Sequence, residues 1–435
     1  MSPVLETPAE VWLQIFIEVI LLYPHGLTFA VNTPEPCITV KLSWVCRFWR
    51  SILQTSSQPW SSMFLPEAEE IDLHGGMVHL VDMYLRLSQQ APLTIFFEPR
   101  FNAGKYSDQV FNLVVNNLPR VQTLYFINYH NRLESFEEAV ITSLIERQLE
   151  DYPVRFPILK TLGVFLQRGR STPVFEHLWK VFTSCPSLMT FHPTFSYTSD
   201  SLHMSDLSNI RHFRGSFSFV RALHIWLARM PKLETLCLDA PVVNHWRIFG
   251  PSSCTAHNLV ELSIFTTEST GGWFNIHLPS LTKLSLSRIP PEHRIQWTPL
   301  HSIFCTEICE MLVLSGAKLQ FLVVDNIPGI DIEALLRMQP TITSLMVSMN
   351  ANCIGEAEDG YIRSLLELLE TLSRIEPATE IPSIAPCLSK LGIQAVFVGD
   401  YLETIALAKA IKNLLSVRNL EEFNTRGRYS YSLVE

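Results

Sequence analysis

Apolar residues near the start of the chain recur at the spacing of one helical face. They are Val11, Trp12, Ile15, Phe16, Val19 and Ile20. Ahead of them, Thr7 suits an N-cap and Pro8 the first helical position, while Glu10 completes a capping box with Thr7. The pattern therefore predicts a helix that starts at Pro8 and stops before Pro24 and Gly26.

A second helical pattern follows a polar, proline-bearing loop at residues 25–36. Its apolar side is formed by Leu42, Val45, Phe48, Trp49, Ile52 and Leu53. A turn-like run at residues 56–59 then leads to Trp60. Residues 1–65 are therefore predicted to form a small helical module, with Trp49 and Trp60 as members of its internal core.

A phrase of the form Pro-x-Leu-x-x-Leu-x-Leu recurs through the rest of the chain. The clearest copies occupy residues 231–238 (PKLETLCL) and 279–286 (PSLTKLSL). The first apolar residue of each copy falls at Val121, Leu159, Leu188, Ile210, Leu233, Leu259, Leu281, Leu319, Ile342, Leu388 and Leu420. Consecutive copies lie 22 to 46 residues apart, and the short gaps fit the period of leucine-rich repeats, about 20–29 residues.

The phrase has a simple physical meaning. Its last two apolar positions alternate, so they predict a strand with one buried face. Helical patterns precede several copies, at residues 110–118, 174–182 and 220–227, and the proline of the phrase ends each helix. Helix and strand in alternation predict a stack of units with parallel strands on a concave side and helices on a convex side. An ordinary leucine-rich α/β domain is the alternative, and the long gap between 342 and 388 leaves the continuity of the stack open.

The non-leucine positions of the concave strands are the expected contacts for a bound protein. In the best copies these positions are Glu234, Thr235, Cys237, Thr282, Lys283, Ser285, Thr343, Ser344 and Met346. Their mixed character names no ligand, so the sequence does not define which residues bind a substrate.

The N-terminal module resembles the F-box-like domain that is common in mushroom-forming fungi. The resemblance rests on Pro8, Glu10, Val11, Trp12, Ile15 and Phe16, then on residues 42–50 (LSWVCRFWR), then on residues 59–62 (PWSS). The middle block is the most specific part. The family usually has leucine before the proline, where this chain has Thr7, and the loop between the helices is longer here.

The resemblance implies a three-helix module that docks on a Skp-type adaptor, which links it to a cullin and a RING ubiquitin ligase. The implied adaptor contacts are Pro8, Glu10, Val11, Ile15, Phe16, Val45, Cys46 and Trp49. The fold class expected for the whole chain is α/β. It combines an F-box-like module at residues 1–65, a connecting segment at 66–90 and an irregular leucine-rich-repeat solenoid, or horseshoe, at 91–435.

The function that the resemblance implies is that of a substrate receptor in a Skp–cullin–F-box ubiquitin ligase, with the repeats holding a protein substrate. A leucine-rich-repeat scaffold without a ligase role is the alternative, which Thr7 favours. An enzyme with an unrecognised site is the third alternative.

Composition and charge narrow the class of protein and its location in the cell. Hydrophobic residues make up 47% of the 435 residues and charged residues 17%, which is typical of a globular chain. The net charge of −9 argues against nucleic-acid binding. The longest apolar run, residues 11–23, is too short and too polar to span a membrane. Nine scattered cysteines and a start without signal-peptide features predict an intracellular protein of the cytoplasm or nucleus.

Motifs for catalysis are absent from the sequence. It contains no phosphate loop, GxGxxG turn, HExxH or CxxC pair. His301, Cys305 and Cys309 share a helical spacing, but a structural metal site needs a fourth ligand. We therefore expect no catalytic residue, no metal and no cofactor.

Overall fold

The computed structural model describes residues 7–22, 38–65, 76–97, 105–128, 156–166, 185–193, 207–216, 223–239, 253–266, 276–288, 301–327, 329–350, 358–375, 382–397 and 401–429. The chain is an α/β protein whose main strands all pair in parallel. It divides into two compact units, Met1–Ile210 and Arg211–Glu435.

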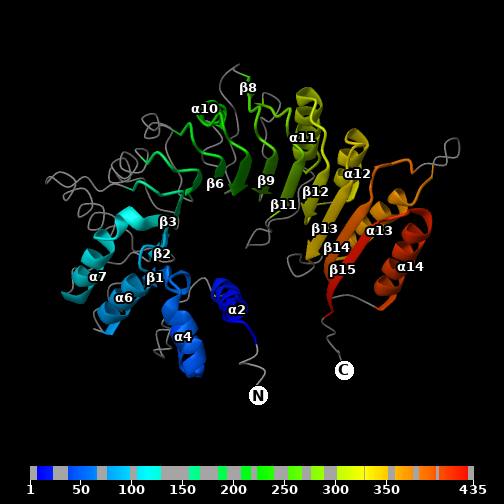
Figure 1. Ribbon diagram of the computed structural model, residues 1–435. Helices are drawn as coiled ribbons and strands as arrows, with labels where there is room; N and C mark the ends of the chain where they lie inside the picture. Colours follow the sequence, from blue (N-terminus) through cyan, green and yellow to red (C-terminus); the bar gives the residue numbers. More distant parts are fainter. Residues whose placement is uncertain are drawn as a thin grey trace. The chain divides into compact units, whose positions relative to one another are not determined.

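The first unit begins with helices (Figure 1). They are α2 (Ala9–Leu22), α3 (Ile38–Val45) and α4 (Arg47–Thr55). The first i to i+4 hydrogen bond of α2 runs from the N–H of Trp12 to the carbonyl of Pro8 at 3.3 Å. Pro8 therefore takes the cap position, one residue later than Thr7, which the sequence had suggested for it.

The pattern over residues 42–53 forms two helices where a single one was expected. Cys46 breaks it with an extended backbone (φ −158°, ψ 169°), and its sulfur accepts a hydrogen bond from the N–H of Trp49 at 3.4 Å. Cysteine thus acts as the N-cap of α4 and satisfies an amide that would otherwise lack a partner. The guanidinium of Arg50 also donates to the carbonyl of Ser43 at 3.0 Å, which ties α4 to α3.

An aromatic cluster holds the helices together. The ring of Trp49 lies 5.0 Å from that of Trp12 and 4.8 Å from that of Phe16, and Phe16 is only 1% exposed. Trp60 is 2% exposed, and its indole N–H donates to the carbonyl of Leu53 at 2.8 Å. The prediction that Trp60 belongs to the internal core is confirmed.

The strands of the first unit pair in chain order. They are β1 (Ser62–Leu65), β2 (Leu93–Phe97), β3 (Val121–Asn128), β4 (Thr161–Leu166) and β5 (Thr190–Pro193). Because β1 pairs with β2, the sheet begins at Ser62, within the segment expected to be purely helical. The short helix η1 (Gln58–Trp60) connects α4 to β1.

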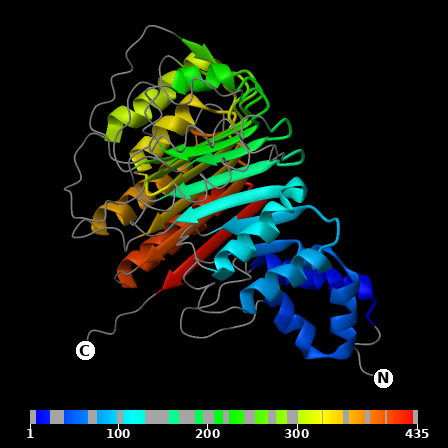
Figure 2. The same cartoon turned by 90° about the vertical axis from the view of Figure 1, so that its left-hand side faces the viewer.

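Helices α6 (Gly76–Leu87) and α7 (Lys105–Val115) pack side by side in the first unit (Figure 2), and η2 (Leu118–Arg120) follows α7. The helix predicted at 110–118 is thus present, displaced by a few residues. The helix predicted at 174–182 lies outside the described residues.

The second unit repeats the same parallel pairing. Its main strands are β6 (His212–Ser216), β7 (Thr235–Asp239), β9 (Glu261–Thr266), β11 (Lys283–Arg288), β12 (Phe321–Asp325), β13 (Ser344–Asn350), β14 (Lys390–Phe397) and β15 (Glu422–Tyr429). Each pairs with its neighbour in this order. A separate two-stranded pair joins β8 (Cys254–Thr255) to β10 (Ile276–His277).

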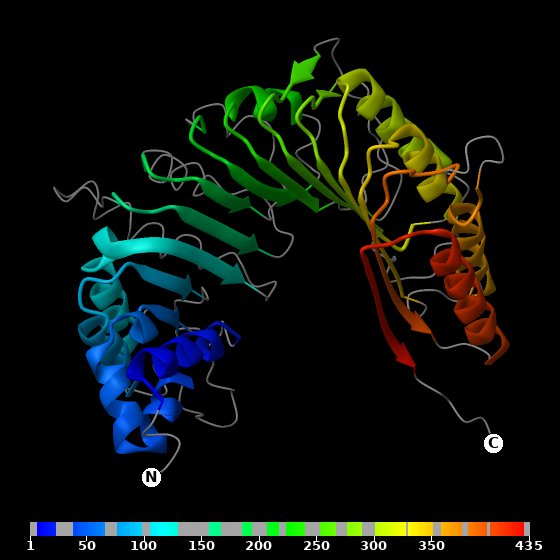
Figure 3. The same cartoon turned by 45° about the vertical axis from the view of Figure 1, so that its right-hand side comes forward.

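Helices line one side of these strands (Figure 3). They are α10 (Leu223–Arg229), α11 (His301–Ser315), α12 (Gly329–Met338), α13 (Glu358–Leu372) and α14 (Tyr401–Val417). The long gap between the repeats at 342 and 388 contains α13, and β13 pairs directly with β14. The strand order is therefore continuous across that gap.

Leucines of the repeated phrase form the core of the strand layer. The residues in register across it are Phe213, Leu236, Leu262, Leu284, Leu322, Leu345 and Leu391, and all of them are buried. The second alternating position, which includes Leu238, Ile264 and Leu286, is buried as well. The first apolar residue of each phrase is also buried, except for Leu420 in the last copy, which is half-buried. The alternation predicted for the phrase is confirmed at these positions.

The proline of the phrase occupies a tight turn. In the copy at 231, the N–H of Leu233 donates to the carbonyl of Met230 at 3.0 Å, which places Pro231 at the second position of a β-turn. The same bond recurs from Leu281 to Leu278 at 3.1 Å and from Leu388 to Ala385 at 3.0 Å. Proline suits this position because its fixed φ matches the turn.

Two arginines, Arg418 buried and Arg120 half-buried, bind backbone carbonyls. Arg418 is 5% exposed and donates to the carbonyls of Leu372 and Ala385, both at 2.8 Å, and to that of Ile384. Burial lowers the pKa of Arg418 to about 10. In the first unit, Arg120 similarly donates to the carbonyl of Ala91 at 3.1 Å.

We predict that Phe16→Ala destabilises the first unit by about 3–5 kcal/mol, because it leaves a cavity in the aromatic cluster. Ile15→Ala should change stability by less than about 0.5 kcal/mol, because Ile15 is 42% exposed. Urea unfolding followed by tryptophan fluorescence measures both. Equal effects of the two substitutions would contradict the assignment of Phe16 to the core.

We predict that Arg418→Met lowers the free energy of unfolding by about 2–4 kcal/mol, because buried carbonyls lose their donor. Arg418→Lys should restore only part of the loss, since one ammonium cannot match the planar guanidinium. Arg363→Met is the control, because Arg363 has a side chain that is 81% exposed in a surface ion pair. Chemical denaturation followed by circular dichroism measures all three, and a neutral Arg418→Met would refute the role given to this residue.

Candidate protein-interaction surfaces

The helical module exposes large apolar side chains at two places. Val11 and Ile15 lie one turn apart on α2 and are 47% and 42% exposed. Trp44 and Val45 end α3, and each is 61% exposed. Apolar side chains left uncovered on short helices are typical of surfaces that bind a partner.

The implied adaptor contacts separate into exposed and internal residues. Pro8 and Glu10 are exposed, as are Val11, Ile15 and Val45. Phe16 is a correction: its side chain is buried in the aromatic cluster and does not reach the surface.

The other two implied contacts are half-buried. The sulfur of Cys46 caps α4, and the ring of Trp49 packs against Trp12 and Phe16. The indole N–H of Trp49 is buried and has no hydrogen-bond partner within the described part of the chain. Both side chains therefore make contacts within the module while part of each remains accessible.

Trp44 is an exposed apolar residue of the module that the predicted contact set did not include. It stands within the block that carries the F-box resemblance, but outside the apolar side of the helical pattern. A tryptophan away from the core-facing side of a helix was the signal that could have identified it.

The second unit exposes the face of its strands opposite the buried leucines. This exposed strand face contains the registers that start at His212 and at Arg214 on β6. The residues predicted for it are all half-buried or exposed, and they are Glu234, Thr235, Cys237, Thr282, Lys283, Ser285, Thr343, Ser344 and Met346. In these copies of the phrase, the sequence thus identified which positions reach this surface.

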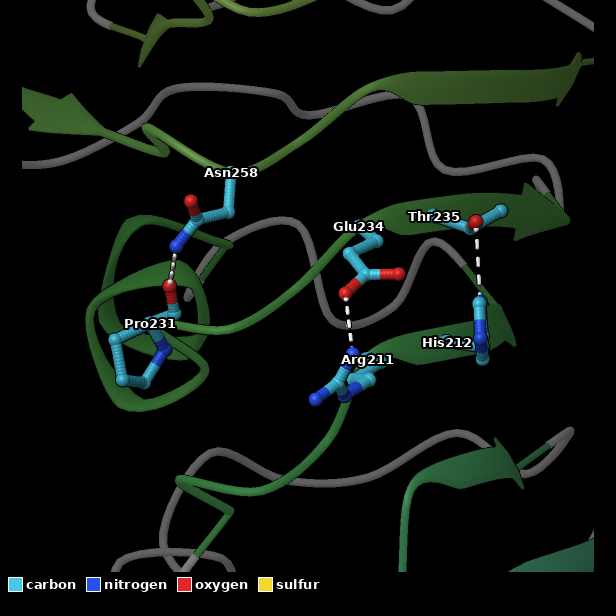
Figure 4. A network of polar contacts seen from close by, with 6 residues as sticks. All are labelled: Arg211, His212, Pro231, Glu234, Thr235 and Asn258. Carbon is cyan, nitrogen blue, oxygen red and sulfur yellow. Dashed lines mark hydrogen bonds and ion pairs between the residues drawn. The ribbon is translucent and has the colours of Figure 1, made fainter.

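Opposite charges pair across neighbouring strands on this face. Arg211 and Glu234 approach to 2.9 Å where β6 and β7 begin, and the imidazole Nδ1 of His212 lies 3.1 Å from the hydroxyl of Thr235 (Figure 4). Further along, Lys283 pairs with Glu261 at 2.7 Å and Lys390 with Glu422 at 3.2 Å. Such exposed pairs add little stability, about 0–1 kcal/mol each, but they cancel much of the local charge.

The turns beside this face are also linked from one repeat to the next. The side-chain amide of Asn258 donates to the carbonyl of Pro231 at 2.7 Å (Figure 4). In the first unit, the hydroxyl of Ser187 donates to the carbonyl of Pro157 at 2.9 Å in the equivalent place. These bonds hold successive turns at a constant spacing.

Arg214 is an exposed cation on β6. Its guanidinium carbon lies 5.8 Å from the centre of the ring of Phe265 on β9, so the side chain extends across β7. The contact with the ring restricts the orientation of the guanidinium.

An apolar area lies on β12 and β13. Phe321 is 43% exposed and Met346 is 41% exposed, with Val323 half-buried next to them. The Met346 side chain lies over Gly392, since a Cβ at that glycine would meet the methionine sulfur. Glycine at this position lets the methionine lie flat on β14.

Aromatic rings follow one register of the first unit. The rings of Phe96 and Tyr125 stack at 5.0 Å with an interplanar angle of 8°, and His192 lies 6.2 Å beyond Tyr125. The stacked pair of Phe96 and Tyr125 is half-buried and joins β2 to β3 on this face. Burial also raises the pKa of Tyr125.

The described residues contain no group of His, Cys, Asp or Glu arranged to hold a metal ion. Cys309 of α11 is 7% exposed, and burial, with Asp331 and Glu310 nearby, raises the pKa of its thiol to about 11. A thiol with such a pKa stays protonated at neutral pH and is a poor nucleophile and metal ligand. The side chains of His301 and Cys305 lie outside the described part of the structure.

No helix within the described ranges has both the length and the apolar character needed to cross a membrane. No protein-family model matches the chain, and neither does any curated protein.

Proposed function

We propose that this protein is the substrate-receptor subunit of a Skp–cullin–F-box ubiquitin ligase. The helices of the first unit would bind the Skp-type adaptor, and a leucine-rich-repeat solenoid would bind the substrate. The chain itself would supply proximity between substrate and ligase, not bond chemistry.

The exposed apolar residues of the helical module carry this proposal. Val11, Ile15, Trp44 and Val45 remain at the surface although the module already has an aromatic core of its own. Short helices that leave apolar side chains uncovered are suited to a partner with a complementary apolar surface. The resemblance to F-box-like domains names a Skp-type adaptor as that partner.

The repeated strand layer supports the second half of the proposal. Helices cover one side of the strands in the second unit, while the side chains of the other side remain half-buried or exposed. Successive strands place their alternate residues in register, which produces a broad surface of variable composition. Repeat proteins bind their partners on such surfaces.

A scaffold that binds proteins without a ligase is the second candidate. Thr7 stands where F-box domains usually have leucine, and this favours a module that has lost adaptor binding. The exposed strand face would serve a scaffold equally well.

We predict that the purified chain captures a Skp-type adaptor, and that the double variant Ile15→Asp, Val45→Asp reduces the capture by at least about tenfold. Binding would bury the two introduced aspartates, and this should weaken the binding free energy by at least about 1.4 kcal/mol. That loss corresponds to a tenfold lower affinity. Both positions are exposed in the free chain, so the variant should keep its fold. Co-purification quantified by gel densitometry measures the effect.

Val313→Asp on α11 is the matched control, because Val313 is 51% exposed and lies in the second unit. It should capture the adaptor as the unmodified chain does. A folded unmodified chain that captures no adaptor would refute the ligase proposal and leave the scaffold.

A further inference from the structure

Strand β15 forms an edge of the sheet in the second unit. Among the strands that the structure describes, it pairs only with β14. The N–H of Glu422 donates to the carbonyl of Ser389 at 3.3 Å, so the backbone N–H and C=O of Glu422 point toward β14. Because these groups alternate in direction along a strand, those of Phe423, Thr425 and Gly427 point to the opposite side. This outer side of β15 can therefore pair with a further strand.

The apolar core is less complete at this edge than on the inner strands. Leu345 and Leu391 occupy the buried register on β13 and β14, and they are 1% and 2% exposed. Phe423 occupies the same register on β15 and is half-buried. Leu420 is half-buried as well, whereas Leu388, which begins the preceding copy of the phrase, is 6% exposed. A further strand beside β15 would remove apolar surface from water at this edge.

The sequence of β15 is self-complementary when two copies of the strand pair antiparallel. Residues 422–429 read EFNTRGRY. Placing Thr425 opposite Thr425 of a second copy sets Glu422 of each copy opposite Arg428 of the other. The same register sets Phe423 of each copy opposite Gly427 of the other. The backbone groups that point away from β14 then meet across the two-fold axis, so this register can form the hydrogen bonds of an antiparallel ladder.

Charge favours this register over the other one of equal length. Residues directly opposite each other in an antiparallel pair lie on the same face of the sheet, where opposite charges attract. The side chain of Glu422 is 60% exposed and pairs with Lys390 at 3.2 Å, so its carboxylate can accept a second cation on the exposed strand face. The other register pairs residues 423–429 with themselves and places Arg426 opposite Arg426, which is repulsive.

The pair of Phe423 and Gly427 supports the same register on the opposite face of the sheet. A glycine on an edge strand leaves backbone uncovered, and an aromatic residue directly across from it can cover that backbone. Phe423 is half-buried, so part of its ring remains to make such a contact. Each copy supplies one phenylalanine and one glycine, so the two-fold axis generates the contact twice.

We propose that β15 pairs antiparallel with β15 of a second copy of this chain. A second copy fits the edge because both halves of the complementary pattern, acid with base and phenylalanine with glycine, lie in one strand. The two sheets then continue into one, with the two-fold axis at Thr425 and both exposed strand faces on the same side. This interface goes beyond the proposed ligase role and does not depend on it.

Sedimentation velocity of the full chain without any adaptor measures the dissociation constant of the dimer. Glu422→Arg and Arg428→Glu each place like charges opposite each other at both ends of the paired segment, so each should weaken the dimer by about tenfold or more. The double variant Glu422→Arg, Arg428→Glu restores opposite charges and should recover the dimer. An equimolar mixture of the two single variants should form a mixed dimer, because one strand then has arginine at both positions and the other has glutamate at both.

Thr425→Pro tests the backbone pairing separately from the charges. The N–H of Thr425 points away from β14, so proline removes a bond to the second copy without removing one within the sheet. This variant should be monomeric. Arg363→Glu on α13 is the control, because it reverses an exposed charge on a helix and should leave the dissociation constant unchanged. Circular dichroism establishes that each variant keeps its fold.

The inference is overturned if the unmodified chain stays monomeric, if the folded single variants dimerise as the unmodified chain does, or if the double variant does not recover the dimer. These outcomes are independent of adaptor capture, because β15 lies in the second unit and the adaptor surface lies in the first. A chain that dimerises as expected but captures no adaptor would sink the ligase proposal and preserve this one.

Discussion

The carbonyl that follows each buried anchor residue determines how the strands of this protein assemble. The carbonyl of Thr282, next to Leu281, accepts the N–H groups of Gln320 at 2.8 Å and Phe321 at 3.0 Å. The same double acceptance recurs at Val260, where the donors are Thr282 and Lys283, both at 3.0 Å. Each repeat therefore starts the strand of the next one at a defined register.

That register decides which side chains of each strand are buried and which reach the surface. Since side chains alternate along a strand, a shift of one residue would exchange the leucine core for the polar face. The buried leucines resist such a shift, because every one of them would have to enter solvent. The side chains of the exposed strand face can consequently vary without affecting the core.

The helical module is stabilised by a small aromatic core and not by a repeated strand layer. Its aromatic core of Trp12, Phe16 and Trp49 is small, and the helices are short. A small core cannot cover every apolar side chain, so Ile15 and Val45 stay at the surface. A partner that covers them would gain affinity from side chains that already protrude, and the module would need little rearrangement.

Sequence reasoning was most accurate where the physics is local and periodic. The anchor positions of the repeats, the burial of the alternating leucines and helices such as α10, predicted at 220–227, all follow from spacing alone. It was less accurate where two local preferences compete. The break at Cys46 was missed, because a cysteine that caps a helix has no distinct sequence signal.

The sequence by itself determined the periodic elements and the inward and outward positions of the strands in the clearest copies of the repeated phrase. Only the tertiary structure decided that Phe16 is internal while Trp44 is exposed, that β1 belongs to the sheet and that β13 adjoins β14 across a long gap. It also brought Arg214 over Phe265, from separate repeats. The physical reason is that periodicity describes one element at a time, whereas burial and contact depend on which neighbours the fold places against it.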